Sequence, residues 1–503
     1  MLLSPSPTKR KNILHILPPE IVVEILRFIK LDQRFCLRLI SRDICENVDY
    51  SWTGDRFHDI PREINDENLR QLSGAQLIDL SFCKDITDEG LKHFIEGGIN
   101  SFEILLPFQI TDKGLEYLGQ SKVGKIYLSE CIVTDRGLRY LGKSEVYDID
   151  LTWCDQITDQ GLEWFSEERK NRIRYINLDH CDKITDKGLK ALSKIGVERI
   201  SLCGCKNITD LGLKYLSKCG IRRISLLKCF RITDKGLEYL GKGKIESVVL
   251  SKHIPVTDKG LKALAEGGIK SIGLSGCNRF TDKGLEYLGK SGIEKIWLSN
   301  CIQVTDLGLR FLVENKGPKI IYLNGCLQIT DKGLEALKNS HIEIISLYKC
   351  NISDLGLRYI LGAKKIYLSN CKLITDQGLE YLAEGGVQSI KLSCCTQITD
   401  RGLKALGKGG IQQISLYDCV QIVDEHLKYL SGVKRIDLSG CHQITDEGLK
   451  YLSNVENIYL QGCNLITDQG LKYLKKVKFI LLNGCNLVTD EGVKYLKPCQ
   501  IYR

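Results

Sequence analysis

Cysteine is the residue type that most suggests chemistry in this chain, because 22 cysteines in 503 residues could form disulfides, bind a metal or supply a nucleophile. A zinc site needs close ligand pairs such as C-x2-C, and neither Cys203/Cys205 nor Cys394/Cys395 has that spacing. Sixteen cysteines instead recur at one position of a repeat: Cys83, Cys131, Cys154, Cys181, Cys205, Cys229, Cys277, Cys301, Cys326, Cys350, Cys371, Cys395, Cys419, Cys441, Cys463 and Cys485. We therefore predict that they are buried packing residues with a weak S–H donor, and neither disulfides nor metal ligands.

The remaining reactive residue types form no catalytic pattern. The eight histidines are scattered over the sequence: His15, His58, His93, His180, His253, His341, His426 and His442. No phosphate-binding loop, G-x-S-x-G elbow or H-E-x-x-H motif is present. We expect a protein that is not an enzyme and needs no cofactor or metal.

The repeat has the pattern I-x-x-I-x-L-x-x-C-x-x-I-T-D-x-G-L-x-x-L, as in residues 293–312. Its I-x-L part alternates with period two and predicts a short strand, whereas T-D-x-G-L-x-x-L has helical spacing and begins with residues that suit a helix N-cap. Glycine follows two residues after the aspartate in 17 of 18 units, with His426 as the exception. Because glycine disfavours a helix by about 1 kcal/mol, its recurrence indicates that a side chain there would collide with the neighbouring unit.

The units recur every 22 to 27 residues, and an aspartate marks each one: residues 88, 112, 135, 159, 186, 210, 234, 258, 282, 306, 331, 354, 376, 400, 424, 446, 468 and 490. Ile64-Asn65-Asp66 begins a degenerate nineteenth unit. We predict an α/β solenoid over residues 60–503, with a curved parallel sheet inside and helices outside. The extra charged stretch at residues 167–172 is expected to be a solvated outer loop. The repeat resembles the cysteine-containing leucine-rich repeats of F-box/leucine-rich-repeat proteins over about 430 residues.

Residues 1–11 are predicted to be a flexible tail, and residues 12–52 depart from the repeat and predict two short amphipathic helices. This helical segment resembles an F-box in Leu17-Pro18-x-Glu20-Ile21, in Ile25-Leu26, and in residues 37–42. The resemblance implies a Skp1-like adaptor and cullin complex as partners, contacted by Leu17, Pro18, Ile21, Ile25, Leu26, Leu39 and Ile40. The alternative is a helical cap for the solenoid.

The concave sheet is the candidate surface for a protein substrate, because its outward-facing residues vary from unit to unit. Four adjacent predicted strands carry Trp297, Tyr322, Tyr348 and Tyr367, and Trp and Tyr are enriched where proteins bind one another. Lys295, Lys365 and Lys391 flank these rings, which favours acidic groups on the ligand, while Asp148, Asp150 and Asp179 lie on earlier strands. The alternative is that the tyrosines merely cover the sheet.

The net charge of +9 is a mild bias over this length and does not require a nucleic-acid partner. Without a secretory signal or a membrane-spanning stretch, the chain is expected in the cytoplasm or nucleus, or in a host cytoplasm if it comes from a parasite or virus. The resemblance implies a substrate-recognition subunit of an SCF-type E3 ubiquitin ligase. The alternatives are a protein-binding scaffold or inhibitor without a ligase link, and, third, a nucleic-acid binder.

Overall fold

The computed structural model describes residues 65–67, 69, 77–80, 83–96, 103–107, 109–169, 172–496 and 499–502. The chain divides into two compact units, residues 1–57 and 58–503, and the described residues all belong to the second. The predicted Skp1-binding residues Leu17, Pro18, Ile21, Ile25, Leu26, Leu39 and Ile40 therefore lie outside the described residues.

Strands and helices alternate along the whole described unit. The strands are β1 Leu77–Asp79, β2 Glu103–Leu105, β3 Lys125–Tyr127, β4 Asp148–Asp150, β5 Ile173–Asn177, β6 Val197–Ser201, β7 Arg223–Ser225, β8 Ser247–Val249, β9 Ser271–Gly273, β10 Lys295–Trp297, β11 Ile320–Tyr322, β12 Ile344–Ser346, β13 Lys365–Tyr367, β14 Ser389–Lys391, β15 Gln413–Ser415, β16 Arg435–Asp437, β17 Asn457–Tyr459, β18 Phe479–Leu481 and β19 Gln500–Tyr502. The helices are α3 Asp88–Glu96, α4 Asp112–Leu118, α5 Asp135–Gly142, α6 Asp159–Glu168, α7 Asp186–Ile195, α8 Asp210–Lys218, α9 Asp234–Gly241, α10 Asp258–Glu266, α11 Asp282–Ser291, α12 Asp306–Val313, α13 Asp331–Glu335, α14 Asp354–Leu357, α15 Asp376–Glu384, α16 Asp400–Lys408, α17 Asp424–Leu427, α18 Asp446–Leu449, α19 Asp468–Leu471 and α20 Asp490–Val493. Short 3-10 turns follow α17, α18 and α20, at Lys428–Leu430, Lys450–Leu452 and Lys494–Leu496.

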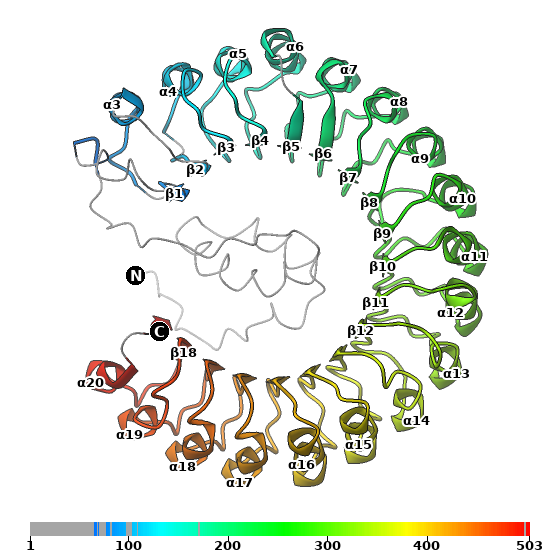
Figure 1. Cartoon of the computed structure of the whole chain (residues 1–503), viewed down its shortest axis with the longest axis vertical. Helices are drawn as coiled ribbons and strands as arrows, with labels where there is room; N and C mark the ends of the chain where they lie inside the picture. Colours follow the sequence, from blue (N-terminus) through cyan, green and yellow to red (C-terminus); the bar gives the residue numbers. More distant parts are fainter. Residues whose placement is uncertain are drawn as a thin grey trace, which may run out of the picture. The chain divides into compact units, whose positions relative to one another are not determined.

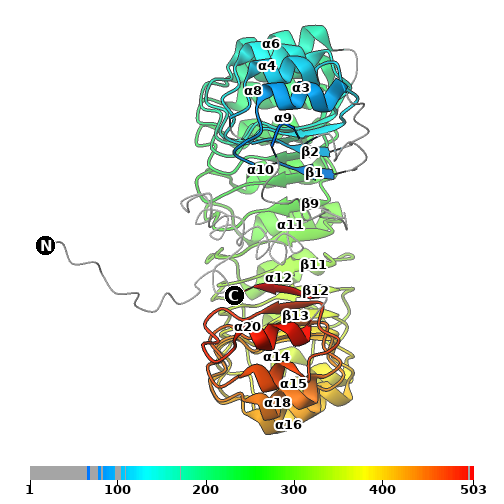
Figure 2. The same ribbon diagram turned by 90° about the vertical axis from the view of Figure 1, so that its left-hand side faces the viewer.

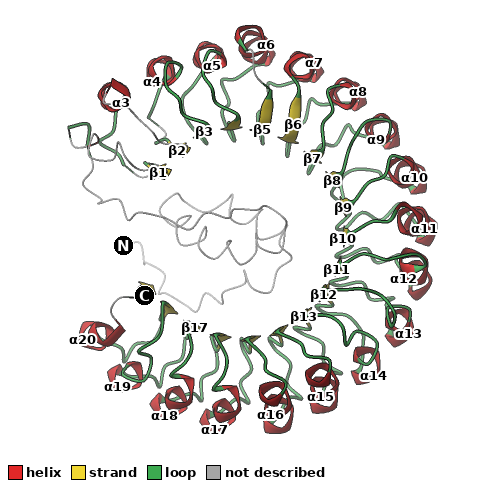
Figure 3. Ribbon diagram, viewed as in Figure 1, coloured by secondary structure: helices red, strands yellow, loops and turns green. Residues whose placement is uncertain are grey.

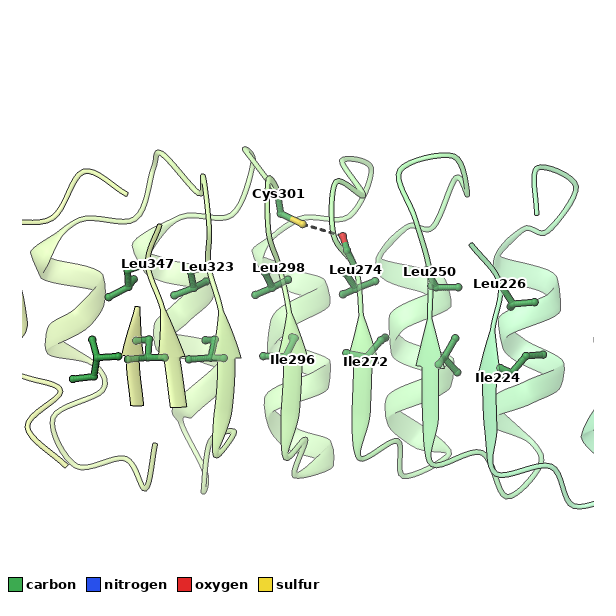
Figure 4. Close-up of a cluster of buried hydrophobic side chains, with 14 of the residues drawn as sticks. Ile224, Leu226, Leu250, Ile272, Leu274, Ile296, Leu298, Cys301, Leu323 and Leu347 are labelled. Atoms are coloured by element: carbon green, nitrogen blue, oxygen red, sulfur yellow. Dashed lines mark hydrogen bonds between the residues drawn. The ribbon is translucent and has the colours of Figure 1, made fainter. Parts of the chain in front are cut away.

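The strands pair in parallel with their sequence neighbours and form one sheet. This sheet lines the inner side of the curved array and the helices lie on its outer side, stacked one after another (Figures 1, 2 and 3). The Ile and Leu of each I-x-L segment point into the space between the two layers, where they form two continuous buried rows (Figure 4). The predicted leucine-rich-repeat solenoid is thus confirmed for the described residues.

A carboxylate clamp joins each repeat to the next. Asp306 Oδ1 accepts a hydrogen bond from Thr330 N at 2.8 Å, and Asp306 Oδ2 accepts one from Thr330 Oγ1 at 2.7 Å. Thr330 Oγ1 in turn accepts from Lys332 N and so caps helix α13. Equivalent pairs recur from Asp66 with Thr87 to Asp468 with Thr489, so Asp66 performs the role expected of a degenerate first unit.

The repeated glycine makes room for this clamp. A Cβ atom at Gly333 would lie 2.3 Å from Asp306 Oδ1, and the other glycines at this position would meet the preceding aspartate at 1.9–2.7 Å. Non-bonded atoms do not approach so closely, which confirms the predicted collision with the neighbouring unit. Aspartate, threonine and glycine therefore act together across each junction.

The repeated cysteines pack between neighbouring repeats, as predicted. They are buried, with Cys83 half-buried, and most of them donate a hydrogen bond to a leucine carbonyl of the preceding repeat. Cys301 Sγ, for example, lies 3.1 Å from Leu274 O (Figure 4). Burial raises the pKa of Cys326 to about 12, so these thiols stay protonated at neutral pH.

One junction departs from the pattern in two positions at once. Val423 stands where the other repeats have Thr or Ser and provides no side-chain cap for α17, and His426 stands where they have glycine. The Val423 N–H donates instead to His426 Nδ1 at 3.1 Å. Because the valine side chain has no hydroxyl to donate to Asp400 and its N–H bonds to His426, the space that glycine keeps open for the clamp is no longer required, which explains why the two exceptions occur together.

Of the charged stretch at residues 167–172, the structure describes residues 167–169 and 172, and the first three do not form the solvated outer loop that the composition suggests. Helix α6 extends through Glu168, which pairs with Arg139 at 3.0 Å. Arg169 is buried, contacts the Phe165 ring, and donates to the carbonyls of Ser144 and Val146. The longest repeat therefore uses part of its extra length to bind the preceding repeat.

Candidate protein-binding surface

The inner face of strands β10–β13 brings together three of the four predicted aromatic residues, Trp297, Tyr322 and Tyr367. In the parallel register Trp297 lies beside Tyr322, and Ser346 lies between Tyr322 and Tyr367. The Trp297 and Tyr322 rings are stacked, with centroids 5.9 Å apart and planes at 10°. The three rings form one cluster that Ile320 and Ile344 extend along the same strands.

These rings are more enclosed than the sequence alone suggests. Trp297, Tyr322 and Tyr367 are buried, whereas Tyr348 is half-buried. The indole nitrogen of Trp297 and the hydroxyl of Tyr348 have no hydrogen-bond partner although both atoms are buried. An unpaired buried donor costs about 1–3 kcal/mol, so these two groups lower the stability of the fold.

The fourth predicted aromatic residue, Tyr348, lies in the turn after β12, where Asn324 holds its backbone. The Asn324 side-chain oxygen accepts hydrogen bonds from Ser346 Oγ and from Tyr348 N, the latter at 3.1 Å. It thereby fixes the loop that follows β12, and the Tyr348 ring lies under Lys349 Nζ at 5.1 Å from its centroid. The phenol is thus held in place although it belongs to a turn.

The predicted lysines lie on the same face. The first residues of strands β10–β13 lie side by side in the register, and they are Lys295, Ile320, Ile344 and Lys365. On the next strand, Lys391 Nζ lies 4.9 Å from the centre of the Tyr367 ring. Among residues 295–299, 320–324, 344–348, 365–369 and 389–393 no carboxylate is present. This part of the inner face is therefore aromatic and positively charged.

The acidic residues of the earlier strands have structural partners. Asp148 is buried and bound by Arg174, with Arg199 at 4.0 Å. Asp150 accepts from the backbone and hydroxyl of Thr152. Asp179 accepts hydrogen bonds from Ser201 Oγ at 2.6 Å and from the backbone N–H of Cys203 at 2.7 Å.

Carboxylates return to the inner face beyond β14. Burial and the nearby Asp418 and Asp437 raise the pKa of the Tyr417 hydroxyl. Asp437 also accepts from Ser415 Oγ at 3.1 Å. Acidic residues therefore adjoin the aromatic, basic surface on the side of β15 and β16, whereas strands β7–β9 on its other side carry no carboxylate.

The comparisons with known proteins concern the repeat and the fold. The "Leucine Rich repeat" family model matches residues 76–94, 172–193, 387–407 and 433–453, and no curated protein sequence matches the chain. None of the described helices is long and apolar enough to cross a membrane. With its repeat pattern and its sheet-and-helix array, the chain has the fold of a leucine-rich-repeat solenoid.

Three solved structures are similar to the chain. The Rad7–Elc1 complex of yeast has 15% identity and a TM-score of 0.42, over 94% of this chain and 98% of that chain. The TLR13–ssRNA13 complex has 13% identity and a TM-score of 0.48, over 83% and 76%. An internalin (inlF) of Listeria monocytogenes has 18% identity and a TM-score of 0.39, over 73% and 93%.

Proposed function

We propose that this protein is the substrate-recognition subunit of an SCF-type E3 ubiquitin ligase. Its inner face at β10–β14 holds a protein substrate, and the F-box-like segment at residues 12–52 binds a Skp1-like adaptor, which connects to a cullin. The observation that carries the binding role is the joined aromatic and lysine surface without a carboxylate. The ligase link is supported by the Leu17-Pro18 segment directly ahead of cysteine-type repeats.

The surface suits an acidic protein segment with aromatic or aliphatic side chains. Lys365 is exposed at the rim, and it offers a cation to a carboxylate. The protein itself needs no catalytic group for this role, because it only positions the substrate near the charged conjugating enzyme.

A protein-binding scaffold or inhibitor without a ligase link is the second candidate. It uses the same inner face and requires nothing from residues 12–52. Affinity for Skp1 separates the two, since a scaffold does not bind it.

Co-purification of the full chain with Skp1 tests the ligase link. We expect a stable complex, and we expect Leu17→Asp together with Ile25→Asp to abolish it. A Lys365→Glu, Lys391→Glu variant is the matched control and should retain Skp1. If the unchanged chain does not bind Skp1, the ligase role is wrong and the scaffold role stands.

A further inference from the structure

Trp153 and His180 form a ring stack at the turns that follow strands β4 and β5. The ring centroids are 4.1 Å apart and the two planes are inclined by 3°. The His180 ring lies against Gly204 of the following repeat, where a Cβ atom would be 2.6 Å from the ring. His180 therefore covers one face of the indole, while 39% of Trp153 remains exposed.

Both rings are carried by backbone that disfavours a side chain. Trp153 and His180 have φ angles of 61° and 62°, in the left-handed region. Six other repeats have glycine at the equivalent position, as at Gly204 and Gly276. Residues with a Cβ atom have a steric cost in this region that glycine does not have, and the stacking of one ring pair does not outweigh that cost at two positions. Residues held in such backbone conformations cluster at binding sites, which makes this stack a candidate site.

Carboxylates surround the stack. Asp150 ends β4, and Asp155 lies two residues after Trp153. Asp179 lies in the turn after β5. Burial raises the pKa of the Cys181 thiol to about 12, and the negative charges of all three carboxylates contribute to the rise. Because all three act on the same thiol, they lie close to one another around these turns.

Two of these carboxylates keep their charge without a cation. Asp150 accepts hydrogen bonds from Thr152 and Asn177, which are neutral side chains. Asp155 is exposed, and its carboxylate has no partner among the residues that the structure describes. A negative field therefore extends to the exposed part of Trp153.

The cations on the same loops do not cancel this field. The loops after β3–β6, at residues 129–134, 152–158, 179–185 and 203–209, contain four carboxylates and two lysines. Lys206 is paired with Asp182 at 2.7 Å, and Lys183 donates to Gln156 Oε1 at 3.2 Å. The surroundings of Trp153 are therefore acidic overall.

Two nearby tyrosines have an arginine of this chain over the ring, whereas Trp153 has none. Arg174 lies 4.8 Å from the centroid of the Tyr147 ring, and Arg199 lies 5.5 Å from that of Tyr175. Within the described part of the chain, no lysine or arginine lies over the Trp153 ring, and His180 is its ring partner. Tryptophan is the side chain that attracts a cation most strongly, so an acidic site with an exposed indole is complementary to a cation from a ligand.

We propose that Trp153 binds an arginine side chain of the protein ligand held on the inner face. A guanidinium group is planar, so it stacks on the indole while its N–H groups donate to Asp155. The compact, strongly hydrated ammonium group of lysine matches a flat ring less well. This inference rests on the protein-binding role proposed above and not on the ligase link. It adds a basic residue to a ligand whose acidic part contacts Lys365 and Lys391.

Fluorine NMR of the full chain labelled with 5-fluorotryptophan tests the site directly. The chain has four tryptophans, and replacing each with phenylalanine assigns its resonance. We expect Nα-acetyl-arginine amide to shift the Trp153 resonance until the site is saturated. Nα-acetyl-citrulline amide has nearly the same shape without the charge, and it should bind at least about fivefold more weakly. Trp164, which already has Arg139 over its ring at 5.8 Å, is an internal reference and should not shift.

Two variants with equal changes in net charge locate the binding. Asp155→Asn removes an exposed carboxylate and keeps its shape, so it should weaken binding of Nα-acetyl-arginine amide about threefold. Glu384→Gln, at the end of the outer helix α15, is the matched control and should leave the affinity unchanged. Equal affinities of the two variants would mean that Asp155 does not hold the guanidinium group, and the proposal would be wrong.

Three other outcomes would overturn the proposal. The first is an unchanged Trp153 resonance in the presence of Nα-acetyl-arginine amide, and the second is equal affinity for the citrulline compound. The third is tighter binding of Nα-acetyl-phenylalanine amide, which would show that the stack receives an aromatic ring. None of these results depends on Skp1, Lys365 or Lys391, so the arginine site and the proposed function succeed or fail separately.

Discussion

The two sides of each strand differ in how much they vary between repeats. Toward the helices, Ile, Leu and Cys recur almost unchanged, and Asp, Thr and Gly recur at the helix start. Toward the inner face, Trp297, Ser346 and Lys391 occupy equivalent positions of neighbouring repeats. The interior side therefore determines how repeats stack, and the inner face determines what they bind. Variants on the first side should change stability, and variants on the second should change binding.

The largest effect on stability is expected from alkaline pH. Burial raises the pKa of Cys277 and Cys350 to about 12 and that of Cys395 to about 11, against about 8.5 for an ordinary thiol. At a pH between the unfolded and the folded pKa values, these thiols are deprotonated in the unfolded chain but still protonated in the folded chain. The stabilisation is complete below about pH 8.5 and is lost as the pH rises toward the folded values, by up to about 1.4 kcal/mol per pH unit for each thiol. Circular dichroism should show a steep fall in Tm above about pH 9.

A variant with Cys301→Ala, Cys326→Ala and Cys350→Ala separates the thiols from lysines and tyrosines, which also titrate at high pH. It should be less stable at pH 7, but its Tm should fall less steeply with pH. If Tm fell equally steeply with pH in both proteins, the three replaced thiols would not be responsible for the fall.

Closing the space beside a clamp should produce the next largest effect. Gly333→Ala places a Cβ atom 2.3 Å from Asp306 Oδ1 and must displace the carboxylate from Thr330. We expect the free energy of unfolding to fall by about 2–4 kcal/mol despite alanine's better helix propensity. Gly432→Ala is the control, because nothing lies within 4 Å of its Cβ position. Equal urea midpoints for the two variants would contradict the clamp's importance.

The strands and helices of the repeats were predictable because every repeat must place the same residue types at the same positions in order to stack on its neighbours. Strand, N-cap and glycine positions follow from periodicity, and the glycine even indicates a close neighbour. The clamp was not predictable as a pair, because Asp306 and Thr330 are 24 residues apart and both suit a helix start without contacting each other. Trp297, Tyr322 and Tyr367 lie together on the inner face, but Tyr348 lies in the turn after β12. Alternation reveals the side of a strand on which a residue lies, and not how deeply a ring such as that of Tyr322 is buried.

Repairing the irregular junction should give a smaller effect of opposite sign. Val423→Thr with His426→Gly introduces the hydroxyl and the space that Asp400 needs in order to clamp the next repeat. We expect a stabilisation of about 1–2 kcal/mol, since a helix cap and a hydrogen bond to a carboxylate are gained. Hydrogen exchange should slow at α17, and Thr445, whose junction is already regular, is the internal reference. Unchanged exchange at α17 would mean that His426 Nδ1 already replaces the clamp fully.

The smallest effect on stability, and the largest on binding, is expected from Lys365→Glu. The side chain is exposed at the rim of the inner face, and surface substitutions of this kind change stability by about 0.5 kcal/mol or less. Lys408→Glu on the outer helix α16 changes the charge equally and serves as the control. Calorimetry should give the same Tm for both variants, while an acidic ligand of the inner face should lose affinity only for Lys365→Glu. A parallel loss in both would attribute binding to net charge instead of to this surface, and a large loss of Tm in Lys365→Glu would show that the two sides of the strand are not independent.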